Sequence, residues 1–269
     1  LPGAIVTASG DDVIGIFGDG LKGAGTWTQA YEANNLGTID FSSSNKATAI
    51  YLNNARGENK GTVKVNDSSI AFYGQGNGSE IYNNGAVEIG NNSVGLYGND
   101  IDIIENLSGA VIKDKGTSNT GIYNIKTTSG ATAINNNGLI ELGNDGVGIY
   151  AENSVITNTG NIIVGDKVNK NSLGIYAKDS ILNDTGNVKV GNSGIAYYGD
   201  NSTLNLNAAS VDIGNNGVLA YGINNTFIDY NLGNKTTSEN TFVYLINSNV
   251  DFNNAEITIG KNGLGVYQE

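Results

Sequence analysis

The 269-residue chain contains no histidine, cysteine or methionine, and proline, tryptophan and arginine occur once each, as Pro2, Trp27 and Arg56. Without histidine and cysteine, the chain has no imidazole for acid–base catalysis, no thiolate nucleophile and none of the usual zinc ligands except carboxylates. A scaffold held together by disulfides is also excluded. We therefore expect no catalytic residue, no metal site and no cofactor.

Basic residues are also scarce, since 14 of them face 26 acidic residues and give a net charge of −12. A nucleic-acid-binding protein needs a cationic surface, so this class of function is excluded. No apolar run reaches the roughly 18 residues that a membrane-spanning helix needs, and we expect no signal peptide within the sequence given. Because the chain does not begin with methionine, we interpret it as an internal piece of a longer polypeptide.

Glycine (39 residues) and asparagine (43 residues) are abundant, yet 39% of the residues are hydrophobic, which argues against disorder. A four-residue element of apolar, small, apolar and aromatic residues recurs along the whole chain. The first interval between aromatic residues is 34 residues, and the others are 22 to 27. The element ends at Phe17, Tyr51, Tyr73, Tyr97, Tyr123, Tyr150, Tyr176, Tyr198, Tyr221, Tyr244 and Tyr267.

Two further short strand patterns lie between these elements, for example at 86–89 and 154–158, and Gly/Asn turns separate them. Such short strands cannot bury their apolar faces alone, whereas stacking each repeat on the next gives a continuous core. The sequence therefore predicts an all-β fold, a right-handed parallel β-helix of about 11 coils of 22–27 residues with three strands per coil. We expect residues 1–269 to form a single solenoid, with irregular coils and an insertion in 1–50 and regular coils in 51–269.

The aromatic residues have two possible orientations. In the copy at 94–97, the simplest assignment points Val94 and Leu96 inward, and it leaves Gly95 and Tyr97 on an outward aromatic stack. The competing assignment turns each ring inward at a corner, where the small residue makes room. An exposed stripe that includes Tyr97, Tyr150 and Tyr176 is a candidate site for sugar rings or a protein partner, or else a self-stabilising ladder.

Asparagine also recurs once per coil or every second coil, which predicts an amide ladder from coil to coil, with a polar ligand groove as the alternative. The copies are Asn83, Asn106, Asn158, Asn183, Asn207, Asn231 and Asn254.

The outward position of the second strand carries alternating charges, which we expect to pair across the ladder in Asp40–Lys64–Glu88 and in Lys189–Asp212–Lys235. The whole column is predicted as Asp40, Lys64, Glu88, Ile112, Glu141, Ile163, Lys189, Asp212, Lys235 and Thr258.

The longest interval, between Phe17 and Tyr51, marks an insertion that contains Trp27 and Tyr31 and is followed closely by Arg56. Insertions in solenoids form surface loops, so these three residues are candidate binding residues. The alternative for Trp27 is a cap on the apolar end of the core. Shorter departures from the repeat are expected to form loops at 113–120, 126–132, 166–172 and 231–240.

The repeat unit N-x-G-x-I-x-I-G-x-x-x-G-V-G-I-Y-A, at Asn136–Ala151 and Asn158–Ala177, resembles the passenger repeats of type V autotransporter adhesins of the fusobacterial outer-membrane type. The resemblance implies a β-helical stalk on the bacterial cell surface, which an outer-membrane β-barrel of the same polypeptide anchors. It also implies adhesion to a host or bacterial surface protein or glycan. Two other functions stay open. One is a polysaccharide-degrading β-helix enzyme, with carboxylates such as Asp11/Asp12 or Asp100/Asp102/Glu105, and the other is a passive spacer.

Overall fold

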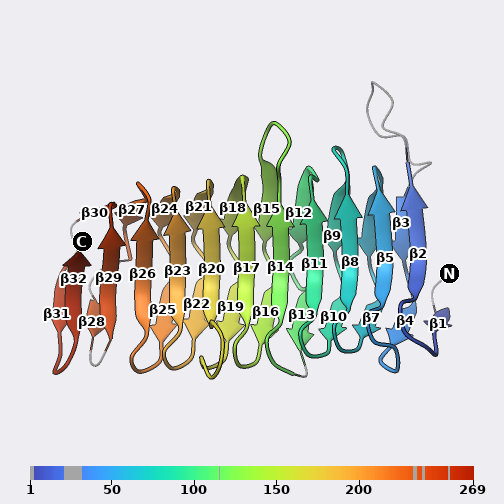
Figure 1. The fold of residues 1–269 in the computed structure, drawn as a ribbon, viewed down its shortest axis with the longest axis horizontal. Coiled ribbons are helices and arrows are strands. Elements are labelled where there is room, and N and C mark those ends of the chain that lie inside the picture. The colour runs from blue at the N-terminus through green and yellow to red at the C-terminus, as the bar shows by residue number, and fades with distance from the viewer. Residues whose placement is uncertain (1–2, 21–31, 115, 233–234, 238–239, 254) are drawn as a thin grey trace.

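The computed structural model describes residues 3–20, 32–114, 116–232, 235–237, 240–253 and 255–269, and within them the chain forms strands and turns but no helix. These residues accordingly include no helix that is long and apolar enough to cross a membrane. Each strand of the three long sheets pairs in parallel with the strand three elements further along the chain. Figure 1 shows the resulting stack of coils, with the first and last strands at opposite ends. The predicted parallel β-helix is confirmed.

The strands belong to sheets A, B and C and to a short sheet D. Sheet A contains β1 (Ile5–Thr7), β4 (Thr38–Phe41), β7 (Thr62–Val65), β10 (Ala86–Ile89), β13 (Val111–Asp114), β16 (Leu139–Leu142), β19 (Asn161–Val164), β22 (Asn187–Val190) and β25 (Ser210–Ile213). Sheet B contains β2 (Ile14–Asp19), β5 (Thr48–Asn53), β8 (Ile70–Gln75), β11 (Val94–Asn99), β14 (Thr120–Ile125), β17 (Val147–Glu152), β20 (Leu173–Lys178), β23 (Ile195–Asp200), β26 (Val218–Ile223), β29 (Thr241–Ile246) and β32 (Leu264–Gln268). Sheet C contains β3 (Glu32–Asn35), β6 (Arg56–Asn59), β9 (Glu80–Asn83), β12 (Ile103–Asn106), β15 (Thr132–Asn136), β18 (Ser154–Asn158), β21 (Ile181–Asp184), β24 (Thr203–Leu206), β27 (Phe227–Tyr230) and β30 (Asn249–Phe252). Sheet D pairs β28 (Lys235–Thr237) with β31 (Ile257–Ile259).

The number of complete turns is smaller than the predicted eleven. In the described residues, nine turns contribute one strand to each of sheets A, B and C, because sheet A has nine strands. In the next turn the first strand is β28, which pairs in sheet D, and the last turn supplies β31 and β32. The aromatic motif counts the eleven strands of sheet B and therefore overestimates the complete turns.

The core consists of the inward residues of all three sheets, which form one continuous apolar cluster. Sheets A and C alternate strictly, so that Ile81, Val87 and Ile112 are fully buried while their strand neighbours face outward. Each such aliphatic side chain contributes about 1.5–3 kcal/mol when it is fully buried. No single coil buries these residues by itself, so stability depends on stacking.

Sheet B departs from strict alternation at the small residue of the repeat. In β11, Gly95 and Leu96 are both buried, and Val94 and Tyr97 on either side of them are half-buried on the outer surface. A Cβ atom on Gly95 would lie only 2.6 Å from the carbonyl oxygen of Gly121 in the next coil. The prediction that Tyr97 faces outward is confirmed, whereas the prediction of Val94 inward and Gly95 outward is wrong. Alternation is interrupted here, and the small residue faces the core.

A ladder of buried asparagine side chains runs through the coils at the end of the sheet C strands. Each Nδ2 donates a hydrogen bond to the Oδ1 of the next member, over 2.7–2.9 Å. The amide ladder is therefore confirmed for Asn83, Asn106 and Asn158, but Asn183 faces outward beside it, and Asn207 and Asn231 are exposed. Asn254 lies outside the described residues. The members are Asn35, Asn59, Asn83, Asn106, Asn136, Asn158 and finally Asp184.

Asp184 ends this ladder because a carboxylate accepts hydrogen bonds without having to donate one. It accepts from Asn158 Nδ2, from the backbone N–H of Gly186 and from the hydroxyl of Tyr197, all inside the protein. Burial raises the pKa of Asp184 above 3.8, and the three hydrogen bonds only partly oppose this effect. The next coil places Leu206 at the ladder position, so the polar interior stops here.

Asparagine residues with a left-handed backbone conformation form the corners between sheets B and C. Asn54, Asn153, Asn201 and Asn247, which follow sheet B strands, adopt left-handed φ values of 47–49°. Asparagine tolerates this conformation better than most residues with a side chain. The corner residues thus turn the chain from sheet B into sheet C without glycine at these positions.

We expect Asn106→Ala to lower the free energy of unfolding by about 2–5 kcal/mol, because it leaves Asn83 Nδ2 and Asn136 Oδ1 buried without a partner. Urea unfolding followed by circular dichroism measures the loss. Asn205→Ala is the control, since this outward amide bonds Asn183 on the half-exposed surface, and its expected effect is below about 1 kcal/mol. Equal losses in both variants would contradict the ladder's role.

Asp184→Asn is expected to change how stability depends on pH. Because the pKa of Asp184 is raised in the folded state, its contribution to stability is fully present when the pH is below the pKa of the unfolded state. This contribution is lost as the pH rises through the pKa of the folded state. The variant lacks this titration, so its stability relative to the wild type should rise with pH above about 4. Unfolding measured at a series of pH values tests this, and a difference independent of pH would argue against a raised pKa.

Candidate functional site

The aromatic residues of the repeat form one column on the outer surface of sheet B. Each ring pairs in register with the ring one coil away, from Phe17–Tyr51 to Tyr244–Tyr267. Neighbouring centroids lie 4.6–5.3 Å apart, and most of the pairs are stacked face to face. The predicted candidates Tyr97, Tyr150 and Tyr176 all belong to this column, which we call the tyrosine stack.

Stacking limits what the tyrosines present to solvent. The faces of inner rings such as Tyr150 are covered by Tyr123 and Tyr176, at interplanar angles of 9° and 4°. Only the ring edges and the hydroxyl groups stay accessible, so an inner ring has no free face on which a sugar ring can stack. The stack is a ridge of edges and hydroxyls.

Several hydroxyl groups of the stack, including those of Tyr97, Tyr123, Tyr150 and Tyr176, have raised pKa values. Burial is the main cause for Tyr176, with added repulsion from Asp200, and its pKa rises to about 12. Burial and a hydrogen bond from the Tyr150 hydroxyl to Glu152 also raise the pKa of Tyr150. These hydroxyl groups are therefore uncharged at neutral pH.

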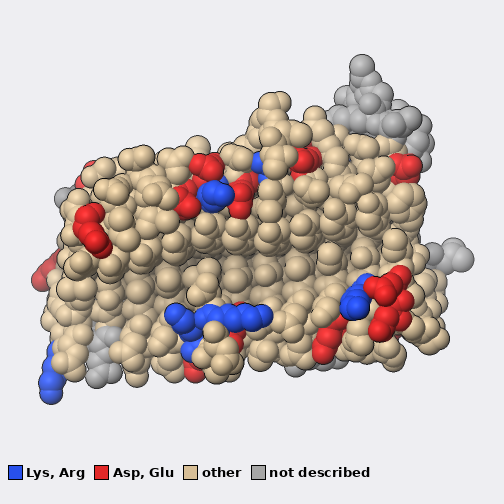
Figure 2. All heavy atoms as spheres, in the orientation of Figure 1, with Lys and Arg blue, Asp and Glu red and all other residues tan. Residues whose placement is uncertain are grey.

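A second outward column lies beside the tyrosine stack, three residues earlier in each strand. It is filled by Thr, Ile, Val and Leu, and most of its members are half-buried. Figure 2, in the orientation of Figure 1, shows a band along the middle of the molecule without charged residues, and charges gather along its two long sides. We call the two columns together the sheet B face. The second column contains Thr48, Ile70, Val94, Thr120, Val147, Leu173, Ile195, Val218 and Thr241.

This second column was missed by the sequence analysis, which placed its members in the core. The signal was present, because threonine fills the position in the copies that end at Tyr51, Tyr123 and Tyr244. A position that accepts threonine as readily as valine is typical of a half-buried outer surface rather than a core.

Arg56 lies on sheet C, apart from the tyrosine stack. Its guanidinium carbon lies 4.7 Å from the ring centroid of Tyr82, and its Nε lies 3.8 Å from Glu80 Oε2. The Tyr82 hydroxyl also donates a hydrogen bond to Glu80, and burial together with Glu80 raises the pKa of Tyr82 to about 12. Arg56 thus belongs to a cluster within the chain. Trp27 and Tyr31 lie outside the described residues.

The charged column on sheet A alternates more regularly than predicted. Glu88 pairs in register with Lys113, not with Ile112, and the ion pair between them measures 3.3 Å. Ile112 is fully buried, because a shift of one residue turns a side chain to the other face of the sheet. The column therefore reads Asp40, Lys64, Glu88, Lys113, Glu141, Ile163, Lys189 and Asp212.

The C-terminal part of this predicted column also needs correction. Lys189 does pair with Asp212, at 2.7 Å. In sheet D, however, Thr258 lies opposite Thr236 and not opposite Lys235, so Lys235 and Thr258 do not share a column position. Strand β28 pairs with β31 and not with β25, so Lys235 does not continue the column after Asp212.

Two of the predicted loops are held by a carboxylate from the preceding coil. Asp145 accepts hydrogen bonds from the backbone N–H groups of Val168, Asn169 and Lys170 in loop 166–172, at 2.7–3.0 Å. Desolvation raises the pKa of Asp145, but these donors outweigh it, and the net pKa lies below 3.8. Asp100 holds loop 126–132 in the same way, through Thr127 and Thr128.

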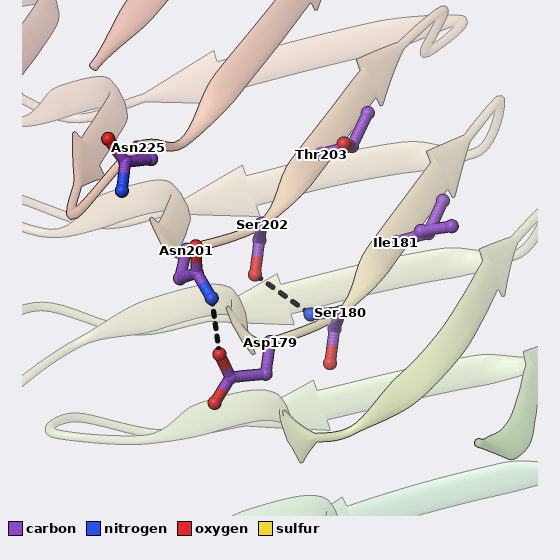
Figure 3. Close-up of a pocket in the computed structure, with 7 residues that line it drawn as sticks. All are labelled: Asp179, Ser180, Ile181, Asn201, Ser202, Thr203 and Asn225. Carbon is purple, nitrogen blue, oxygen red and sulfur yellow. Dashed lines mark hydrogen bonds between the residues drawn. The ribbon is translucent and has the colours of Figure 1, made fainter. Parts of the chain in front are cut away.

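A shallow polar hollow of about 380 Å³ lies at the corner between sheets B and C. Figure 3 shows Asp179, Asn201 and Asn225 along this corner, next to Ile181 and Thr203 on sheet C. Asn201 Nδ2 already donates a hydrogen bond to Asp179 Oδ1, at 2.6 Å. The hollow therefore presents polar groups that partly satisfy one another.

The acidic clusters singled out in the sequence are engaged in contacts between coils. Asp100 holds a loop, Asp102 Oδ1 lies 3.1 Å from the buried Nζ of Lys126, and Asp11 accepts a hydrogen bond from the N–H of Asn45. Within the described part of the chain, no group of three or more acidic side chains could hold a metal ion. Asp229 and Asp251 differ from these acidic clusters, because they are outward residues that lie opposite each other in the register of sheet C.

Ionisation of the tyrosine stack is expected to destabilise the fold. The pKa of Tyr176 is about 12 in the folded chain, and that of a free tyrosine is 10.0. The contribution of Tyr176 to stability is therefore fully present below pH 10, and it is lost as the pH rises through the pKa of the folded state. Absorbance at the phenolate band, recorded together with circular dichroism, should show ionisation above pH 10 coupled to unfolding. Tyr176→Phe removes one ionising group, so its loss of stability over this range should be smaller than that of the wild type.

Comparison of the chain with protein-family models, with curated proteins and with solved structures finds no match. Any function is therefore inferred from the fold and from the surfaces described above.

Proposed function

We propose that this chain is a non-catalytic adhesin segment of an autotransporter passenger, displayed on the bacterial cell surface. The observation that carries the proposal is the sheet B face, which is uncharged and continuous along an otherwise acidic solenoid (Figure 2). An uncharged, partly apolar surface that is bordered by charged residues is typical of interaction sites. The repeat resemblance to fusobacterial autotransporter adhesins supports the same class of function.

The mechanism is display and repeated contact. A solenoid held together by backbone pairing in every coil is stiff, so the outward side chains keep fixed positions along it. Contacts that are weak individually reinforce one another when many copies face the same cell, because the effective concentration of later contacts is high. The partner is a host or bacterial surface protein or glycan, and an outer-membrane β-barrel of the same polypeptide serves as the anchor.

A polysaccharide-degrading enzyme is the second candidate, and it is favoured by Asp229 and Asp251. Paired strands place these outward carboxylates about 5 Å apart, close to the separation of the two carboxyl groups in retaining glycosidases. Against it, Asp229 Oδ1 already accepts hydrogen bonds from Asn231 and Asn253. Reducing sugar released from acidic and neutral polysaccharides, and its loss in Asp251→Asn, would establish the enzyme instead.

Thr120→Lys tests the adhesin proposal, because it places a charge in the middle of the sheet B face without removing a ring from the stack. We expect binding to fall at least about tenfold in a screen of glycans, host surface proteins and bacterial cells, since a desolvated charge costs more than 1.4 kcal/mol. Thr62→Lys is the matched control, because Thr62 has similar burial on the outer surface of sheet A. If the wild type binds nothing in the screen, the segment is a passive spacer.

A further inference from the structure

We propose that the sheet B face is a self-association surface, on which a second copy of this chain packs side by side along the solenoid. This goes beyond attachment to a foreign partner, because it needs only the chain itself. The argument has three steps, which concern charge, periodicity and area.

The first step is charge. Each copy has a net charge of −12, so two copies repel each other unless they meet where neither presents charge. The outer surfaces of sheets A and C carry charged columns, including Glu88 and Lys113 on sheet A and Glu58 and Glu105 on sheet C. The two columns of the sheet B face contain no charged residue from β5 to β29, and the charges of these strands lie only at the third outward position, two residues after the tyrosine, in Glu152, Lys178 and Asp200. The two columns are therefore a surface through which two copies approach without placing like charges together.

The second step is periodicity. The tyrosine stack repeats every 4.6–5.3 Å, and a second copy has the same repeat by construction. Two such surfaces stay in register over their whole length, whereas a partner whose repeat differs by about a tenth drifts by half a period within about five coils. The exposed chemistry is also self-complementary, because a phenol hydroxyl both donates and accepts hydrogen bonds. A two-fold axis parallel to the solenoid axis places the tyrosine stack of one copy against the second column of the other.

The third step is area. Nine strands of sheet B, from β5 to β29, span about 40 Å, and each six-residue strand is about 20 Å long, so the patch covers the two columns and the third outward position beside them. The resulting patch of about 800 Å² per copy is what a standard stable interface buries on each partner. Association thus buries ring edges and aliphatic side chains that the isolated chain leaves half exposed.

Analytical ultracentrifugation of the purified chain tests the proposal. The expected species is a dimer of twice 27.9 kDa that forms with rising concentration up to about 100 µM. Added salt should strengthen it, since salt screens the repulsion between two acidic copies and leaves apolar contact intact. A chain that stays monomeric, or a dimer that salt dissociates, would overturn the proposal. Open-ended oligomers would point instead to contact between the ends, where Ile14 and Val266 are 56% and 44% exposed.

Val147→Glu should weaken the dimer at least tenfold, because it places like charges in the middle of the face. Val111→Glu, at an outward position of similar burial on sheet A, is the matched control and should leave dimerisation unchanged. Thr120→Glu is a second variant of the same face, and circular dichroism verifies that each variant folds. Equal weakening by the Val147 and Val111 variants would rule out this face. Binding to foreign cells or glycans is measured separately, so its absence leaves the dimer result standing.

Discussion

Within the paired strands of this solenoid, each side chain lies beside its counterpart from the neighbouring coils, at the spacing of parallel strands. A residue type that fills a whole column must therefore interact favourably with itself, or alternate with a complement. Tyrosine satisfies this rule by stacking, with ring centroids 4.6–5.3 Å apart. Asparagine satisfies it because one amide donates and accepts at once. Charged residues do not, which is why the outward column of sheet A changes sign from Asp40 through Glu141. The composition of the chain, rich in asparagine and with one tyrosine per coil, follows from this constraint.

The same rule explains how the interior changes along the rod. An amide ladder has a direction, since every Nδ2 donates its hydrogen bond to the next coil. The last donor therefore needs an acceptor that does not have to donate a hydrogen bond in turn. Asp184 supplies this acceptor, and Tyr197 satisfies its second oxygen from a position that is aliphatic in most coils. Beyond this point the ladder position holds Leu206, Tyr230 and Phe252, and the rings of Tyr230 and Phe252 pack at 5.5 Å. One coil thus carries the whole transition from a polar to an apolar interior, and the buried carboxylate is the local cost of stopping the ladder.

Much of this architecture can be predicted from the sequence, because the repeat itself states which residues meet. The tyrosine motif sets the register of sheet B directly, and the amide ladder follows from the spacing of asparagine. The errors arose where the repeat length varies. Lys113 and Ile112 were exchanged because the interval from Tyr97 to Tyr123 is longer than the two before it, and a shift by one residue reverses inside and outside. Val94 and Gly95 were misplaced for another reason. Period-two alternation fails where two consecutive residues face the core, and the sequence shows this only through the small residue that the close approach of the next coil requires. The chemistry of the surface was harder to predict than the fold, since an insertion such as the one in the interval between Phe17 and Tyr51 has no counterpart in the sequence repeat.

The requirement that each residue type packs against its own copies also limits how such a surface recognises a ligand. Stacking hides the ring faces, so the tyrosine column offers what all its members share, namely edges and hydroxyls at a fixed interval. A ligand that contacts one coil meets the same chemistry at the next, so discrimination by a single coil is weak, and selectivity must come from matching the interval over many coils. Departures from the repeat act differently, because each occurs once. Two features interrupt the regular repeat of the surface. They are the loop at 166–172, which Asp145 holds, and the corner hollow around Asp179. A partner bound along the face can slide from coil to coil unless such a feature fixes its position. The regular columns therefore determine how strongly a partner is held, and the irregular loops determine where.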